Sequence, residues 1–191
     1  MQKQFIEIYE QNIKREGAPA LLAWLEKAGF FKDPASTRFH GAYEGGLLEH
    51  SLNVYYRLVQ LVNTFWPEEQ RPSDETLAIV ALLHDVCKTG GFYKVELRNK
   101  KNEQTGAWEK VPAYYIDDPL PYGHGEKSVY IISGFMKLSR EEDMAIRFHM
   151  GAFAPEVKGG DNSVSKAFEM YPLAFLLHTA DMMASYLDEK I

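Results

Sequence analysis

The segment TLAIVALLHDVCK, residues 76–88, constrains the fold most, because it is apolar on nearly every side and yet ends in charged residues. Its pattern predicts a helix that begins after a cap at Ser73 or Asp74 and stops at Gly90 and Gly91. A helix without a polar face needs apolar neighbours all round. We therefore expect this helix at the centre of a helical bundle.

The end of this helix carries His84, Asp85 and Lys88. Burying an ionised aspartate costs several kcal/mol unless the carboxylate is paired or coordinates a metal. The sequence therefore demands a partner for Asp85. His84 and Lys88 are four residues apart, so a continuous helix would place both on one face, where they can point into the same cavity.

Two other apolar segments carry similar groups. LLHTADMM places His178 and Asp181 three residues apart on a helix, and GGLLEHS places His50 in the first turns of a long helix. Imidazole nitrogens and carboxylate oxygens from separate helices form a ligand set suited to Mn, Fe, Co, Ni or Zn. The sequence therefore predicts a metal site between helices.

The apolar residues recur at helical spacing over most of the chain. Ser139 and Glu142 predict a capping box for a helix that reaches His149. We expect one domain over residues 1–191, with a core at about 40–188 against which N-terminal helices within 3–29 pack. Further helices are expected at about 126–137, 165–170 and 172–188.

Residues 93–116 depart from the helical pattern. Apolar and charged residues alternate on both sides of a turn at Asn102 to Gly106, which predicts a small β-hairpin. Pro112 lacks a backbone donor and restricts its strand to an edge. The basic and aromatic residues of the hairpin either contact an oligonucleotide, with Trp108 stacking on a base, or form a solvated face.

Composition excludes several classes of protein. With 46% apolar residues and a net charge of −6, the chain is typical of a globular protein without long-range attraction for duplex DNA. It contains no apolar run long enough for a membrane span and no secretory leader pattern at its start. One cysteine, Cys87, allows no intrachain disulfide, which favours a cytoplasmic location. Cys87 is expected to be a small buried thiol.

A histidine, a His-Asp doublet and a distant aspartate occur in GGLLEHSLNV, LLHDVCK and LLHTADMMAS. This pattern resembles the HD superfamily of metal-dependent phosphohydrolases over residues 40–188. The resemblance implies an all-α HD-domain bundle, here with the hairpin as an insertion. It also implies that His50, His84, Asp85 and Asp181 bind the first metal ion.

Two more histidines extend the resemblance. His124 in YGHGEKSV and His149 in AIRFHMG fall where two-metal members of the superfamily place the ligands of a second ion. The resemblance implies one or two divalent ions (Mn, Fe, Co, Ni, Mg or Zn), bridged by Asp85, that activate water. Asp85 and Lys88 are then the catalytic candidates, with Lys88 holding a substrate oxygen.

Other candidate residues lie on connections. Tyr43, on the loop before the His50 helix, and Lys158, in the long connection 151–163, are candidate substrate contacts. For His178 the alternatives are orientation of Asp181 and a hydrogen bond to a backbone carbonyl, and for His40 they are similar. On the loop that follows His40, either Tyr43 or Glu44 reaches the metal cavity or caps the helix.

The expected activity is hydrolysis of a phosphoester in a phosphorylated small molecule, a nucleotide or a short single-stranded nucleic acid. A GYP motif, which would favour cyclic dinucleotides, is not evident. Two alternatives use the same ligands. One is a mixed-valence di-iron oxygenase, and the other is a module that senses a nucleotide without turnover. The oligomeric state is not predicted.

Overall fold

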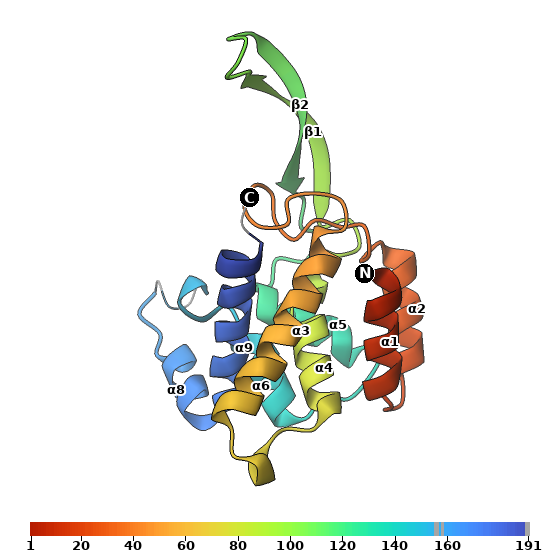
Figure 1. Cartoon of the computed structure of the whole chain (residues 1–191), viewed down its shortest axis with the longest axis vertical. Coiled ribbons are helices and arrows are strands. Elements are labelled where there is room, and N and C mark those ends of the chain that lie inside the picture. The colour runs from red at the N-terminus through yellow and green to blue at the C-terminus, as the bar shows by residue number, and fades with distance from the viewer. Residues whose placement is uncertain (155–156, 158, 190–191) are drawn as a thin grey trace.

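The computed structural model describes residues 1–154, 157 and 159–189. This part of the chain is mostly helical, with one two-stranded antiparallel sheet that extends from the helices as an arm (Figure 1). It contains no helix with the length and apolar character that a membrane crossing requires. The main elements are α1 (Gln2–Asn12), α2 (Ala18–Ala28), α3 (Gly46–Phe65), α4 (Asp74–Leu83), β1 (Tyr93–Lys101), β2 (Trp108–Ile116), α5 (His124–Ser133), α6 (Arg140–Phe148), α8 (Ser163–Met170) and α9 (Pro172–Met183), with short helical turns η1 (Glu68–Gln70), η2 (Val86–Lys88), η3 (Gly151–Phe153) and η4 (Ala184–Asp188).

Helix α4 lies among the other helices, as its apolar sequence predicts. Residues 77–83 are all buried, and the helix packs against α1, α3 and α6. The Ser73 side chain caps its first turn by accepting a hydrogen bond from the backbone N–H of Thr76 at 3.2 Å. Helix α9 packs against both α3 and α6, so α3, α4, α6 and α9 form one packed group.

The end of α4 differs from the expectation. The α-helix stops at Leu83, and the chain continues through His84 and Asp85 into the 3₁₀ turn η2. Asp85 leaves helical geometry at φ −109° and ψ 19°, and its carbonyl accepts a hydrogen bond from the Lys88 N–H at 2.9 Å. The prediction of a helix continuing to Gly90 was therefore wrong. The tighter turn brings Lys88 back to the Asp85 carboxylate.

The hairpin arm, residues 93–116, is confirmed. Its strands pair from Tyr93 with Ile116 at the root to Lys101 with Trp108 near the turn. Because the sheet has two strands, each strand is an edge, and the missing N–H of Pro112 costs no hydrogen bond to a third strand. Most of the arm is exposed, and it contributes little to the helical core.

An ion pair network joins the N-terminal helices to the body. Arg15, between α1 and α2, binds both carboxylate oxygens of Glu142 on α6, at 2.8 and 2.9 Å. Glu142 also accepts hydrogen bonds from the Thr76 hydroxyl at 2.9 Å and from the Ser139 backbone N–H at 2.8 Å. The capping box of α6 predicted from the sequence is therefore also part of an interhelical contact.

We predict that Glu142→Ala lowers the free energy of unfolding by about 3 kcal/mol, because it leaves Arg15 partly buried without its main partner. Burial acts to raise the pKa of Glu142, but hydrogen bonds from Arg15, the Ser139 backbone and Thr76 lower it below its ordinary value. This contribution is present above the pKa of the unfolded chain and is lost as the pH falls through the folded pKa. Urea unfolding at pH 7 and pH 3 should therefore show a variant deficit that shrinks in acid.

The exposed Glu69→Gln on η1 serves as the control and should unfold like the wild type. A deficit for Glu142→Ala that stays constant between the two pH values would contradict the electrostatic account.

Candidate metal centre

Three of the predicted ligands meet where α3, α4 and α9 come together. The Nε2 atom of His50 lies 3.2 Å from Nε2 of His84 and 3.3 Å from Oδ1 of Asp181. His50 comes from the first turns of α3, His84 follows the last residue of α4, and Asp181 lies near the end of α9. These atoms are close enough to contact one ion.

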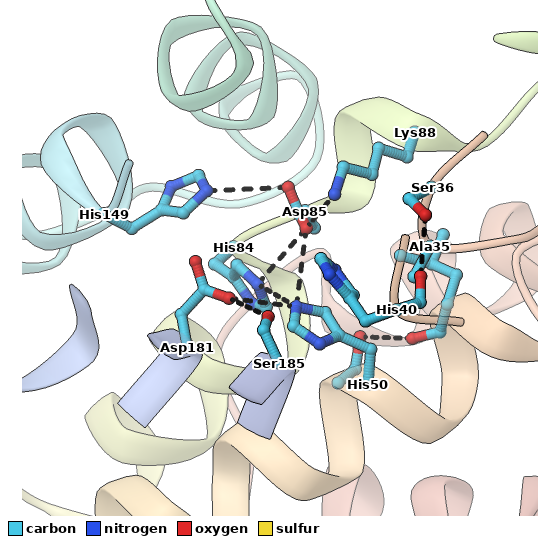
Figure 2. Close-up of polar contacts among 12 residues, drawn as sticks. Ala35, Ser36, His40, His50, His84, Asp85, Lys88, His149, Asp181 and Ser185 are labelled. Atoms are coloured by element: carbon cyan, nitrogen blue, oxygen red, sulfur yellow. Dashed lines mark hydrogen bonds and ion pairs between the residues drawn. The ribbon is translucent and has the colours of Figure 1, made fainter. Parts of the chain in front are cut away.

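A second group of ligand atoms shares His84. Nε2 of His84 lies 3.4 Å from Oδ2 of Asp85, and Nε2 of His149 lies 3.5 Å from the other oxygen, Oδ1. Figure 2 shows the His149 ring approaching one oxygen of Asp85, while His84 and His50 lie nearer the other oxygen. Asp85 thus faces both groups of ligands.

Local backbone contacts fix which nitrogen faces the site. The Nδ1–H of His84 donates to the carbonyl of Ala81 at 2.8 Å, and the Nδ1–H of His149 donates to the carbonyl of Ile146 at 2.7 Å. Each histidine directly follows its helix and bonds a carbonyl three residues earlier. In the neutral ring this leaves the Nε2 lone pair directed into the site, which is the form that binds a metal.

His50 is oriented by a carboxylate that the sequence reasoning missed. Its Nδ1–H lies 3.1 Å from both oxygens of Glu189, and Asn53 donates to the same carboxylate at 3.0 Å. A carboxylate behind a histidine fixes the ring and makes the opposite nitrogen a better metal ligand. No spacing rule links Glu189 to Asp181, so the sequence contained no motif that would have identified it.

The charges of the site favour a cation. Burial acts to lower the pKa of His50, but hydrogen bonds to Asp181 and Glu189 raise it to about 10. Burial acts to raise the pKa of Asp85, whereas the charge of Lys88 lowers it well below its usual range. Asp85 is therefore an anion at neutral pH, and without a metal His50 is held as a cation. A divalent ion would displace the extra proton and neutralise the same carboxylates.

Unpartnered atoms support the same conclusion. Among the described residues, Oδ1 of Asp85 and Nε2 of His149 are buried without a hydrogen-bond partner. Buried polar atoms of this kind are rare unless a ligand, ion or water completes them. The residues therefore fit a divalent metal in chemistry, burial and convergence, although the arrangement does not identify the metal.

His124 lies beside this group of residues. Among the described residues, it belongs to no set of three or more potential ligand atoms that lie within 4.8 Å of one another. Its Nδ1 is 3.5 Å from Sγ of Cys87, and its ring packs against Phe92. Burial raises the pKa of the Cys87 thiol to about 12, which fits the expected buried thiol. Of the two histidines assigned to a second ion, His149 contacts Asp85.

The residues predicted to contact the substrate differ in their position relative to the ligand cluster. Nζ of Lys88 lies 2.6 Å from Oδ2 of Asp85, at the edge of the ligand cluster. Tyr43 is 46% exposed, and its hydroxyl donates to Glu49 at 2.6 Å, so it lies outside the cluster. Lys158 falls outside the described residues.

His40 lies at the site. Its ring centre is 4.8 Å from that of His50, and its Nε2 is buried without a partner. The loop is held by the Ser36 hydroxyl, which donates to the His40 carbonyl, and by Gly41, whose backbone packs tightly against Gly46 at the start of α3. His40 therefore lies beside the ligand cluster, next to His50.

His178 takes the other kind of role. Its Nδ1–H donates to the carbonyl of His149 at 2.7 Å, and its ring stacks on Phe168. Gly151 approaches the same ring so closely that a Cβ there would lie 2.6 Å from it. His178 therefore supports the backbone that follows α6, and the hydroxyl of Ser185 donates to Asp181 in its place, at 3.3 Å.

Comparisons of the chain with protein-family models, with curated proteins and with solved structures found no match.

We predict that Glu189→Gln weakens Mn²⁺ binding by about 10- to 100-fold. The substitution removes the negative charge beside His50 but keeps the size and shape of the Glu189 side chain. Isothermal titration calorimetry measures the affinity. The neighbouring Asp188→Asn is the matched control, since Asp188 pairs with Arg57 away from the ligands and should bind Mn²⁺ like the wild type. Equal affinities for both variants would show that Glu189 does not tune the site.

Proposed function

We propose that the protein is a metal-dependent phosphohydrolase that cleaves a phosphoester of a nucleotide or nucleic acid. The observation that carries this proposal is the convergence of three histidine Nε2 atoms and two carboxylates in a buried site. A divalent ion bound there would supply Lewis-acid stabilisation of a phosphoryl oxygen and a water of lowered pKa. The resemblance of the histidine and aspartate motifs to those of the HD superfamily of metal-dependent phosphohydrolases is consistent with this chemistry.

The chain's own residues divide into three tasks. His50, His84 and Asp181 would hold one ion, and Asp85 with His149 would extend the site to a second. Glu189 and the carbonyls of Ala81 and Ile146 keep the histidine rings in their metal-binding orientation through hydrogen bonds to Nδ1. Because these partners are fixed before any ligand arrives, the site needs little reorganisation to bind.

Lys88 would bind the substrate phosphate. In the described structure its ammonium group neutralises Asp85 at 2.6 Å. A divalent ion on Asp85 would take over that neutralisation, and the charge of Lys88 would then be available to an anion. Lys88 is held in the tight turn η2, so its position is set by the same backbone that sets Asp85.

The substrate would reach the site from the side of Asp181. Its side chain is 15% exposed, whereas those of His50, His84 and His149 are fully buried. We infer that the phosphoryl group of the substrate approaches from this side. A location of the protein in the cytoplasm is part of the same proposal.

We predict that the wild type binds Mn²⁺ and hydrolyses a member of a panel of nucleotides, bis(p-nitrophenyl) phosphate and short oligonucleotides. Asp85→Asn should lose both the metal and the activity, because it removes the charge shared by both groups of ligands. Elemental analysis and phosphate release measure the two effects. Asp188→Asn again provides a carboxylate control and should retain both.

Three results would contradict the proposal. Full metal content in folded Asp85→Asn would show that the ion lies elsewhere. Turnover that consumes oxygen and requires two irons per chain would support the oxygenase alternative, and binding of a nucleotide without any turnover would support the sensing module.

We predict that His149→Ala lowers the Mn²⁺ content from two ions to one per chain, because Asp85 loses the histidine that faces its Oδ1 atom. If His124 also holds the second ion, His124→Ala has the same effect. Elemental analysis after gel filtration gives the stoichiometry. A wild-type metal content in His149→Ala would limit the centre to one ion.

We predict that Lys88→Met retains the metal and lowers kcat/KM by about 10²-fold or more, since the contact strengthens as charge develops on the phosphoryl oxygens. Thermal unfolding measured on the same samples separates this role from a structural one. A lower melting temperature with unchanged kcat/KM would show that Lys88 only neutralises Asp85.

A further inference from the structure

The hairpin arm is the largest exposed feature that the proposed site does not use. It extends away from the helices (Figure 1), and large apolar side chains on it are open to solvent: Trp108 is 71% exposed and Leu97 65%. An isolated two-stranded hairpin is at best marginally stable in water. An arm of this kind therefore points to a binding partner along its length.

The register divides the arm into two unlike faces. Side chains alternate along each strand, and directly paired residues share a face. Trp108 pairs with Lys101, and the next pair on the same face is Lys110 with Asn99. Toward the root this face continues with Leu97 opposite Pro112. The outer half of this face therefore combines an exposed indole ring with two lysines and an amide.

The charge of the arm is opposite to that of the chain. Residues 93–116 contain five basic and three acidic side chains, a net charge of +2, whereas the whole chain carries −6. Lys94, Arg98 and Lys100 lie on the face opposite Trp108. The basic charge is thus distributed over both faces of the arm, and the rest of the chain carries a net charge of −8.

The root of the arm adjoins the candidate metal centre. Strand β1 begins five residues after Lys88, and the buried Phe92 packs on His124. The Tyr93 hydroxyl donates to the carbonyl of Ala35 at 3.0 Å, on the loop that carries His40. Nine paired residues at about 3.3 Å each give the arm a length of about 30 Å. A linear polymer that follows the arm to its root would therefore reach the candidate metal centre.

We propose that the hairpin arm binds single-stranded nucleic acid, with Trp108 stacking on a base and Lys101 and Lys110 contacting phosphates. Exposed aromatic rings between cations are the usual means of holding a single strand without sequence preference. Only the further statement, that the bound strand is the substrate, rests on the proposed phosphohydrolase function.

A second copy of the chain is the other occupant to consider. The aliphatic part of the face, Val95, Leu97 and Pro112, would fit a protein surface as well. The outer half favours nucleic acid, because a self-pairing interface would bring Lys101 and Lys110 of both copies together at a cost in repulsion. The test therefore separates the two occupants.

The test measures binding of fluorescein-labelled 12-nucleotide poly(dT) and poly(U) by anisotropy, with metal-free protein so that no turnover interferes. Trp108→Ala should weaken binding about tenfold or more, which is the usual effect of losing one stacked base. Lys101→Gln with Lys110→Gln should weaken binding and reduce the slope of log affinity against log salt by about 1.4. These side chains are exposed, so the variants should fold, and circular dichroism checks this.

The control is Lys3→Gln with Lys27→Gln, which removes the same charge from exposed positions on α1 and α2 and should leave the salt slope unchanged. Hydrolysis of a small phosphoester should also be unchanged in the arm variants. A wild type that does not bind either oligonucleotide, or arm variants that bind like the wild type, would overturn the proposal even if that hydrolysis is observed. Analytical ultracentrifugation showing a dimer that the arm variants abolish, with oligonucleotide binding unaffected, would assign the arm to a second copy.

Discussion

The carboxylate of Asp85 is the group on which the arrangement of the helices depends. It is 2% exposed and ionised, so it needs cationic or polar partners on every open side. Lys88 lies on one side, the rings of His84 and His50 on a second, and His149 on a third. Helices α3 and α6 therefore have to present their histidines at the end of α4. Because the apolar helix α4 is buried, the Asp85 carboxylate that follows it is buried as well.

The parts of the fold that the sequence could predict are those with a strong local pattern. The unbroken apolar run of α4 required a central position, and the alternation around residues 102–106 required a hairpin. The capping box at Ser139 marked the start of α6. The sequence could not locate the end of α4, because His84 and Asp85 are compatible with a helix, and what ends it is the backbone turn that places the Asp85 carboxylate among its partners.

The sequence could predict those residues of the candidate site that are polar or charged and lie within apolar segments. His50, His84, Asp85 and Asp181 were identified because polar groups inside apolar helices need a reason. Glu189 and His40 also lie beside His50, but they come from a chain segment beyond α9 and from a loop without periodicity. Their positions depend on tertiary contacts such as the close approach of Gly41 to Gly46. Composition and spacing carry no information about such contacts.

The ligand-bearing segments also bear on how the chain folds. His50, His84, His149 and Asp181 are far apart in the sequence, so an ion that contacts them closes long loops of the chain and acts as a reversible cross-link. The chain has a single cysteine and so has no covalent alternative of its own. When an ion binds the folded chain and not the unfolded chain, its binding free energy adds to the free energy of folding. A bound ion would therefore add to the stability of the packed state, apart from any part that the ion takes in turnover.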